Sequence, residues 1–499
     1  MKAILLFTAL IFFTALRLFS QGVDDALINS QIVYEGTSRS IAMGGATGAM
    51  GGDVTAACIN PAGLGLYRGS EYTFTTGLQH NLVSSTYYSE RTNEGKTRMS
   101  IPNFGAVLSL ECSNYKPLRF IQIGIGLTRT NDYNDIRHYR GMNPSSSYID
   151  SYLQTIYDVD ELYDPSTHIG DYLYDNFAYT LHPAWETFLI DQNHDSLGNI
   201  YFDSPIPQGN IIQDNEVVSS GRAEEWSFAM SANILDKLFV GGSMGLDHIK
   251  RRISHTYTET PGSAGHNAFR EWSFEETLNN DAWGVNLKLG MIYIPTSWFR
   301  FGASWHTRTI YAIDETWYTT TKSSLVHDPQ GSYQYYSPTL NQEYDCFTIP
   351  SYTGSIAFLL GQRGMITADL DYLNYGKAKF NSSDYSFADV NADIKDILGH
   401  SFNIRVGSEW RVYQYFLRVG AAYYGSPYGF GDPNKSTKRL GLGIGYESGS
   451  GIHWDFAYEL GQSTIIDRPY SFYVNGVNVV DGAVLHQWRN KFTITMKLK

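Results

Sequence analysis

Charged side chains recur in segments where apolar and polar residues alternate, and the chemistry that they could perform is the binding of an anion. The guanidinium group of arginine is a planar fork that binds a carboxylate through two hydrogen bonds. An enclosed cation of this kind could hold the head group of a carboxylate-bearing lipid. The same cations could instead pair with carboxylates on neighbouring strands and hold the shape of the protein. The candidate cations are Lys288, Arg300, Arg405 and Arg418. The carboxylates in equivalent positions are Asp369, Asp371, Glu409, Asp455 and Glu459.

Motifs for metal binding and phosphate binding do not accompany these charges. The sequence has no P-loop, no His-Glu-x-x-His pair and no Cys-x-x-Cys pair. Its three cysteines, Cys58, Cys112 and Cys346, are too far apart for a disulfide framework or a metal site. We therefore predict no catalytic residue, no metal and no bound cofactor, and we do not expect an enzyme.

The composition is typical of a membrane wall rather than of a soluble domain. Only 17% of the 499 residues are charged, whereas 15% are aromatic, with 37 tyrosines. Low charge with abundant tyrosine suits a wall that has one apolar face, one polar face and aromatic rims. The net charge of −13 argues against a nucleic-acid partner, because such a partner requires a concentrated basic surface.

Residues 1–20 have the pattern of a signal peptide. Lys2 is followed by an apolar run from Ala3 to Leu16, and Ser20 precedes a plausible cleavage site. No later apolar run reaches the roughly 18 residues that a spanning helix needs. A membrane protein without spanning helices must be a closed barrel, because lipid cannot satisfy open backbone groups.

Beyond residue 70 the dominant hydrophobic period is two, which is typical of strands. In 283–293 and 452–460, apolar residues occupy one face and polar or small residues the other. Many apolar rows end in Tyr or Trp, as lipid-facing strands do at the head-group level. The predicted strands are 70–88, 97–111, 118–132, 223–233, 237–255, 269–294, 298–320, 345–361, 364–380, 400–411, 414–424, 437–447, 451–466 and 483–498. The sequence thus predicts an all-β protein, a transmembrane antiparallel barrel of about fourteen strands, over residues 70–499.

The predicted connections alternate between short and long, as they do in outer-membrane barrels. The tight turns are 112–117, 234–236, 295–297, 362–363, 412–413 and 448–450. The longer, polar loops are 89–96, 133–222, 256–268, 321–344, 381–399, 425–436 and 467–482. The segment 133–222 is too large for a bare loop. Helical spacing in Tyr148–Leu162 and Asp171–Leu181 predicts a small helical cap on the extracellular side.

Residues 34–68 differ from the barrel, since they are rich in Gly and Ala and show no alternation. Small residues suit a compact segment inside a narrow lumen, where backbone approaches the wall closely. We therefore predict that 21–69 forms a plug, or hatch, inside the barrel. The alternative is a flexible leader.

This N-terminal segment resembles the start of the FadL/TodX-like outer-membrane transporters of hydrophobic compounds. The resemblance rests on Ser38-Arg39-Ser40, Gly44-Gly45-Ala46, Gly52-Asp53 and Asn60-Pro61-Ala62-Gly63-Leu64. Over the rest of the chain it concerns strand number and loop order rather than motifs. It implies a bacterial outer-membrane channel that takes up hydrophobic compounds, such as long-chain fatty acids, without ATP or a cofactor.

The resemblance also implies a mechanism. Extracellular loops capture the ligand, the hatch moves, and the ligand leaves sideways through the wall into membrane lipid. Asn60, Pro61, Ala62 and Gly63 would belong to the hatch. An alternative function for such a barrel is that of a protein-docking subunit of a secretion system, with the tyrosine-rich cap contacting the partner.

Overall fold

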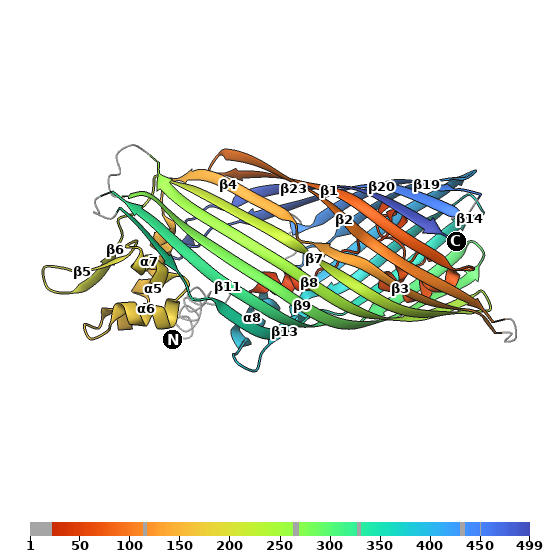
Figure 1. Ribbon diagram of the computed structural model, residues 1–499, viewed down its shortest axis with the longest axis horizontal. Helices are drawn as coiled ribbons and strands as arrows, with labels where there is room; N and C mark the ends of the chain where they lie inside the picture. Colours follow the sequence, from red (N-terminus) through yellow and green to blue (C-terminus); the bar gives the residue numbers. More distant parts are fainter. Residues whose placement is uncertain (1–21, 113–116, 263–268, 327–330, 430–434, 450) are drawn as a thin grey trace.

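The computed structural model describes residues 22–112, 117–262, 269–326, 331–429, 435–449 and 451–499 (Figure 1). The predicted signal peptide at 1–20 and most of the predicted turn 112–117 lie outside the described residues. The helices are α2 (Val23–Ser30), α3 (Ser38–Ala42), α4 (Ala56–Ile59), η1 (Pro61–Leu66), α5 (Tyr148–Tyr157), η2 (Asp160–Tyr163), α6 (Ile169–Phe177), α7 (Leu181–Glu186), η3 (Tyr375–Lys377) and α8 (Ala388–Ile397). No helix among the described residues has the length and apolar character needed to cross a membrane.

Long antiparallel strands make up the wall. They are β1 (Glu71–Tyr87), β2 (Glu90–Glu111), β3 (Leu118–Asp132), β4 (Asp135–Asn143), β7 (Ile211–Ile234), β8 (Leu238–Pro261), β9 (Phe269–Thr296), β10 (Phe299–His306), β11 (Ile310–Leu325), β12 (Ser332–Tyr336), β13 (Leu340–Phe347), β14 (Ser351–Leu360), β15 (Gly364–Asn374), β16 (Lys379–Asn381), β17 (His400–Val412), β18 (Tyr415–Tyr424), β19 (Thr437–Glu447), β20 (Ile452–Asp467) and β23 (Ala483–Leu498). Two small hairpins, β5 (Asp191–His194) with β6 (Ile200–Asp203) and β21 (Tyr473–Val474) with β22 (Val477–Asn478), lie outside the wall.

The wall closes on itself, because β1 pairs with β2 on one side and with β23 on the other. Some strands of the barrel consist of two consecutive segments. For example, β10 and β11 both pair with β9. Counted in this way the barrel has fourteen antiparallel strands, so the predicted fold class is confirmed.

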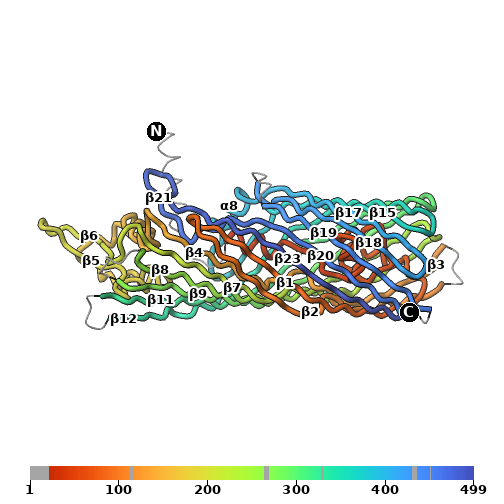
Figure 2. Tube along the Cα trace, turned by 90° about the horizontal axis from the view of Figure 1, so that it is seen from above, coloured from red at the N-terminus to blue at the C-terminus, as the bar shows by residue number. Residues whose placement is uncertain are grey.

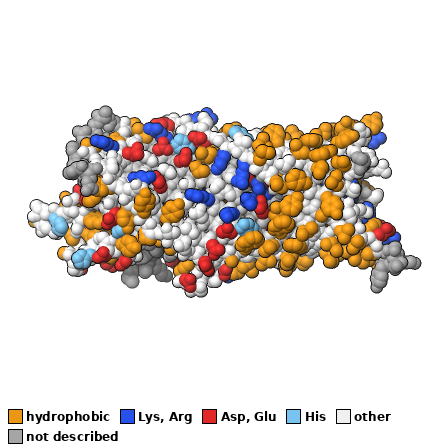
Figure 3. Space-filling model, in the orientation of Figure 1, with side chains coloured by type: hydrophobic (Ala, Val, Ile, Leu, Met, Phe, Trp, Pro, Cys, Tyr) orange, Lys and Arg blue, Asp and Glu red, His pale blue; other side chains and the backbone are white. Residues whose placement is uncertain are grey.

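Alternation divides each strand between lipid and lumen. On β9 the side chains of Trp283, Leu287 and Leu289 are exposed by about half on the outside, whereas Asn286 and Lys288 between them are buried in the lumen. Figure 3 shows that exposed apolar side chains gather in a broad belt over the half of the barrel that carries the tight turns. An apolar belt of this kind is what a barrel wall presents to the hydrocarbon of a bilayer.

The strands extend further at the opposite end than we predicted. The expected loop 89–96 is wrong, because Tyr88 and Ser89, with φ of 42° and 70°, make a two-residue hairpin between β1 and β2. The expected insertion 133–222 contains β4 and the first part of β7, which pair with each other, so the cap is limited to 144–210. These strand ends lie beyond the apolar belt. Polar and charged residues predominate there, as in Glu90–Lys96 of β2, so the hydrophobic alternation in the sequence is weak.

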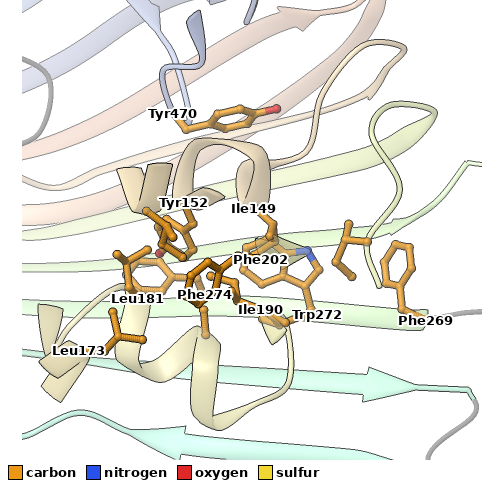
Figure 4. Close-up of a cluster of buried hydrophobic side chains, with 14 of the residues drawn as sticks. Ile149, Tyr152, Leu173, Leu181, Ile190, Phe202, Phe269, Trp272, Phe274 and Tyr470 are labelled. Carbon is orange, nitrogen blue, oxygen red and sulfur yellow. The ribbon is translucent and has the colours of Figure 1, made fainter. Parts of the chain in front are cut away.

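The cap packs its own apolar core against the end of the barrel (Figure 4). Ile149 and Tyr152 of α5 and Leu173 of α6 face Trp272 and Phe274 of β9. Helix α5 begins with a capping box in which Ser147 N donates to the carboxylate of Asp150 at 2.8 Å. Burial and the nearby charge of Glu259 raise the pKa of Asp150 to about 6.

Glu259 of β8 holds the cap to the wall, because this fully buried carboxylate accepts five hydrogen bonds. The donors are Ser147 Oγ (2.5 Å), Tyr148 N (2.8 Å), Gln213 Nε2 (2.9 Å), Tyr257 OH (2.7 Å) and Trp272 Nε1 (2.8 Å). A carboxylate at this position therefore ties α5 to three barrel strands.

We predict that Glu259→Leu releases the cap while the barrel remains folded. Each buried donor that loses its partner costs about 1–3 kcal/mol. We expect cleavage within 144–210 by limited proteolysis to become at least about tenfold faster. Gel mobility without heating reports whether the barrel is still folded. Glu271→Leu, at an exposed position on β9, is the matched control. Equal protection of the cap in both variants would contradict the role assigned to Glu259.

Candidate functional site in the barrel lumen

The segment that precedes β1 lies inside the barrel, as Figures 1 and 2 show for its red trace. Thr37 caps α3 by accepting a hydrogen bond from Ser40 N at 3.2 Å, and its hydroxyl donates to Asp53 at 2.7 Å. The start of α3 is attached to β23, since Ser38 N donates to Thr495 Oγ1 at 2.8 Å. We call residues 22–69 the N-terminal segment.

The Asn-Pro-Ala-Gly element forms the start of η1 and is fully enclosed. Asn60 caps η1 by accepting from Ala62 N at 3.2 Å, and Pro61 occupies the first helical position, where a missing N–H costs nothing. The amide of Asn60 donates to Gly48 O at 2.7 Å and to Met291 O on β9 at 3.3 Å. Asn60 therefore joins two parts of the N-terminal segment to each other and to the wall.

Glycines on the inner face of the wall let the N-terminal segment approach it backbone to backbone. A Cβ on Gly420 of β18 would lie 2.1 Å from the carbonyl carbon of Met43. A Cβ on Gly241 of β8 would lie 2.6 Å from the carbonyl carbon of Pro61. Any other residue at these positions would displace either the wall or the segment.

A chain of buried ion pairs anchors the N-terminal segment to the inner face of the wall. Arg39 binds Glu409 of β17 with both ends of its guanidinium, at 2.8 and 2.9 Å. Arg418 of β18 binds the same Glu409 at 2.6 Å and also binds Asp455. Lys497 binds Asp53 of the segment at 3.0 Å. Burial opposes the ionisation of Asp53, but Lys497 and Arg39 more than offset it and lower the pKa of this carboxyl.

The four cations named from the sequence all face the lumen, and each has a partner there. Lys288 pairs with Glu225 at 2.6 Å, and Arg405 pairs with Asp371 at 2.7 Å. Arg300 donates to the carbonyl of Met50 in the N-terminal segment at 2.7 Å. Arg418 is held by the ion pairs described above. These contacts match the alternative in which lumen charges hold the shape of the protein, and ligand binding by these four residues stays a prediction.

The first part of the N-terminal segment borders a chamber of about 610 Å³ in the lumen. Its lining includes α2, the stretch from Gln31 to Val33, and inner faces of β1, β19, β20 and β23. A volume of this size falls within the range of small-molecule sites, about 300–1,000 Å³.

Sequence reasoning missed the cations of this chamber. Arg439 and Arg489 stand on either side of Gly461 in one row across β19, β20 and β23. Arg439 binds Glu459 at 3.2 Å, whereas the guanidinium group of Arg489 makes no hydrogen bond or ion pair within the part of the chain that the structure describes and interacts only at longer range with the buried carboxylate of Asp132. The alternation of β23, with Lys491 also turned inward, was the signal that could have identified Arg489.

The wall itself is interrupted beside the chamber. Strand β2 pairs with β3 only between Asn103–Thr128 and Glu111–Phe120, and among the described residues 90–102 of β2 have a ladder with β1 alone. At this point β3 turns inward, since Thr128, Arg129 and Thr130 are all buried. The freed carbonyls of Arg129 and Thr130 accept hydrogen bonds from Glu35 N (2.9 Å) and Val33 N (2.8 Å). The N-terminal segment thus replaces β2 as the partner of the bent strand.

One nucleophile pattern occurs in the wall, because Gly241, Ser243 and Gly245 match Gly-x-Ser-x-Gly. A nucleophile elbow requires a sharp turn from strand to helix. Ser243 instead lies within continuous strand β8, where it is paired across the ladder with Lys288. The pattern has no catalytic geometry here.

No family model matches this sequence, and no curated protein matches it. Solved structures do resemble it in fold. The structure of the Pseudomonas putida toluene transporter TodX has a TM-score of 0.50 and 14% identity, with 93% of this chain and 97% of that chain covered. The structure of a Pseudomonas aeruginosa FadL homologue has a TM-score of 0.53 and 12% identity, with 94% and 99% covered. The resemblance stated from the N-terminal motif is thus confirmed at the level of the fold.

Proposed function

We propose that this protein is an outer-membrane channel for the passive uptake of hydrophobic compounds such as long-chain fatty acids, with the N-terminal segment as its hatch. The observation that carries the proposal is that one stretch of the segment, residues 31–35, both lines the chamber and holds the bend of β3. Gln31, Ile32 and Val33 line the chamber, and Val33 and Glu35 bind the bent strand. A ligand in the chamber would therefore contact the backbone that controls the interruption in the wall.

The chamber suits an amphiphile with an anionic head. Leu27, Ile28 and Ile32 supply apolar surface, while the guanidinium group of Arg489 supplies a cation that makes no hydrogen bond or ion pair among the described residues. Gly461 carries no side chain between Arg489 and Arg439, and a ligand carboxylate bound by Arg489 could also contact Arg439, which is held by Glu459. Arg489 is therefore a better candidate for the head group than the paired cations deeper in the lumen.

The exit that we propose is sideways, between β2 and β3. Movement of residues 31–35 would free the carbonyls of Arg129 and Thr130. It would also open the gap beside residues 90–102 of β2, which have no ladder with β3. A hydrophobic molecule that leaves there enters membrane lipid without crossing water. Neither ATP nor a cofactor is needed, because the partition of the ligand into lipid provides the driving force.

The test is uptake of a radiolabelled long-chain fatty acid by cells that lack their own transporter and express this chain. We expect saturable uptake from the intact protein. In Asn60→Ala/Pro61→Ala the hydrogen bonds to Gly48 O, Met291 O and Ala62 N are lost, and we expect the uptake rate to change at least about threefold. Arg489→Gln should raise the half-saturating concentration about tenfold and leave the rate for an uncharged hydrocarbon unchanged.

Two controls distinguish a loss of uptake from a loss of folding. Arg363→Gln, at an exposed tight turn, should behave as the intact protein does. Gel mobility without heating shows whether each variant has folded. A folded barrel that takes up neither fatty acid nor hydrocarbon would overturn the proposed function.

A further inference from the structure

A group of basic side chains lies on the outside of the wall, along the edge of the apolar belt that is nearer to the cap. Figure 3 shows blue side chains gathered along this edge of the belt. Arg222 of β7 and Lys250 of β8 are direct partners across the ladder and are exposed by 44% and 68%. Arg252 follows on the same face of β8 and is also exposed. The proposed activity uses none of these residues.

Two cations of β2, Lys96 and Arg98, do not belong to this group. They pair across the ladder with Asn81 and Gln79 of β1, which are buried on the lumen side, whereas the adjacent Met99 is exposed by 74% on the outside. Within the described part of the chain, the side chain of Arg252 makes no hydrogen bond and no ion pair. We call Arg222, Lys250 and Arg252 the basic patch.

Carboxylates neutralise the patch only in part. Glu224 binds Arg222 at 2.8 Å but is shared with the buried Arg129, and Asp281 lies 3.6 Å from Lys250. Three cations against these two carboxylates leave a local charge of about +1 on a chain whose net charge is −13. The patch is therefore a local exception to the charge of the protein.

The position of the patch specifies its partner. On β8 the exposed apolar residues Val240, Met244 and Leu246 are followed by His248, which stacks on Trp283 of β9 at 4.2 Å. Aromatic side chains at the edge of an apolar belt mark the depth of the lipid head groups. Lys250 and Arg252 come directly after this edge, so they lie at the level where a leaflet carries its phosphates.

We propose that the basic patch binds the phosphates of a phosphorylated glycolipid in the leaflet on the cap side of the membrane. The guanidinium groups of Arg222 and Arg252 would each bind phosphate oxygens as a fork, and the ammonium group of Lys250 would act as a point charge. Basic residues near an anionic membrane surface are attracted to it. Lys96 of β2 donates to Ser219 O of β7 at 2.9 Å, three residues from Arg222, so a bound glycolipid would lie near the interruption in the wall.

The experiment measures binding of diphosphoryl lipid A to the folded, detergent-solubilised full-length protein by native mass spectrometry. We expect Arg222→Gln/Lys250→Gln/Arg252→Gln to bind at least about tenfold more weakly than the intact protein. The control variant Lys237→Gln/Arg363→Gln removes exposed cations at the opposite end of the barrel and should bind normally. Gel mobility without heating shows that each variant is folded.

Two further arms identify the ligand chemistry. Lipid A without phosphates should bind at least about tenfold more weakly to the intact protein, and 10 mM inorganic phosphate should not displace the diphosphoryl form. Retention of diphosphoryl binding in the triple variant, or an equal loss in the control variant, would overturn the proposal. Full displacement by inorganic phosphate would also overturn it, in favour of a simple anion site.

Discussion

A disulfide between the N-terminal segment and the wall is expected to stop ligand uptake reversibly. Ser38 Oγ lies 2.9 Å from Thr495 Oγ1, so the sulfur atoms of Ser38→Cys/Thr495→Cys would point toward each other, and oxidation can test whether they form a disulfide. The three native cysteines are first replaced by alanine. If residues 31–35 must move with the rest of the segment, the oxidised protein should take up fatty acid at least about tenfold more slowly. A reducing agent should restore the rate.

The matched control uses the same wall residue. Thr75 Oγ1 also lies 2.9 Å from Thr495 Oγ1, but Thr75 belongs to β1, so Thr75→Cys/Thr495→Cys links two neighbouring wall strands. That disulfide should leave uptake unchanged in either redox state. Free-thiol labelling measures how completely each pair is oxidised. Normal uptake by a fully oxidised Ser38–Thr495 pair would show that this part of the segment does not gate the channel.

The barrel could be predicted from the sequence because lipid imposes a strict rule on each strand. Every second residue between Trp283 and Tyr293 must be apolar where it faces hydrocarbon, and this period can be read without an alignment. The positions of the lumen-facing charged residues followed from the same two-residue period. The sequence predicted a plug from the glycines and alanines of the N-terminal segment, and in the structure these small residues lie against Gly420 and Gly241 of the wall.

The remainder could not be predicted because it depends on contacts between distant parts of the chain. The alternation of β3 in the sequence continues through Arg129, and only the burial of this stretch and its hydrogen bonds from Val33 and Glu35 reveal that the strand has turned inward. The two-residue period placed Arg405 and Arg418 in the lumen. It could not show that they would form ion pairs with Asp371 and Glu409. Which lumen cation is available to a ligand is therefore a property of the packed structure.

Gly420→Val is expected to displace the N-terminal segment and to open the lumen. Gly420 is held between Gly407 of β17 and Gly441 of β19 by ladders on both sides, so the wall cannot yield easily. A new Cβ would lie 2.1 Å from the carbonyl carbon of Met43 and 2.3 Å from Gly44 N, far inside van der Waals contact. The segment must move instead. In planar bilayers we expect the open probability for small ions to rise at least about tenfold.

Gly354→Val is the control for this change. It places the same β-branched side chain on β14 at a position where a Cβ has no neighbour within 4 Å, and valine is favoured in strands. Its conductance should equal that of the intact protein. In Gly420→Val, cleavage of residues 34–68 by an added protease should rise together with conductance, because both report the same displacement. A closed, protease-resistant Gly420→Val barrel would show that the close approach at Met43 does not hold the segment in place.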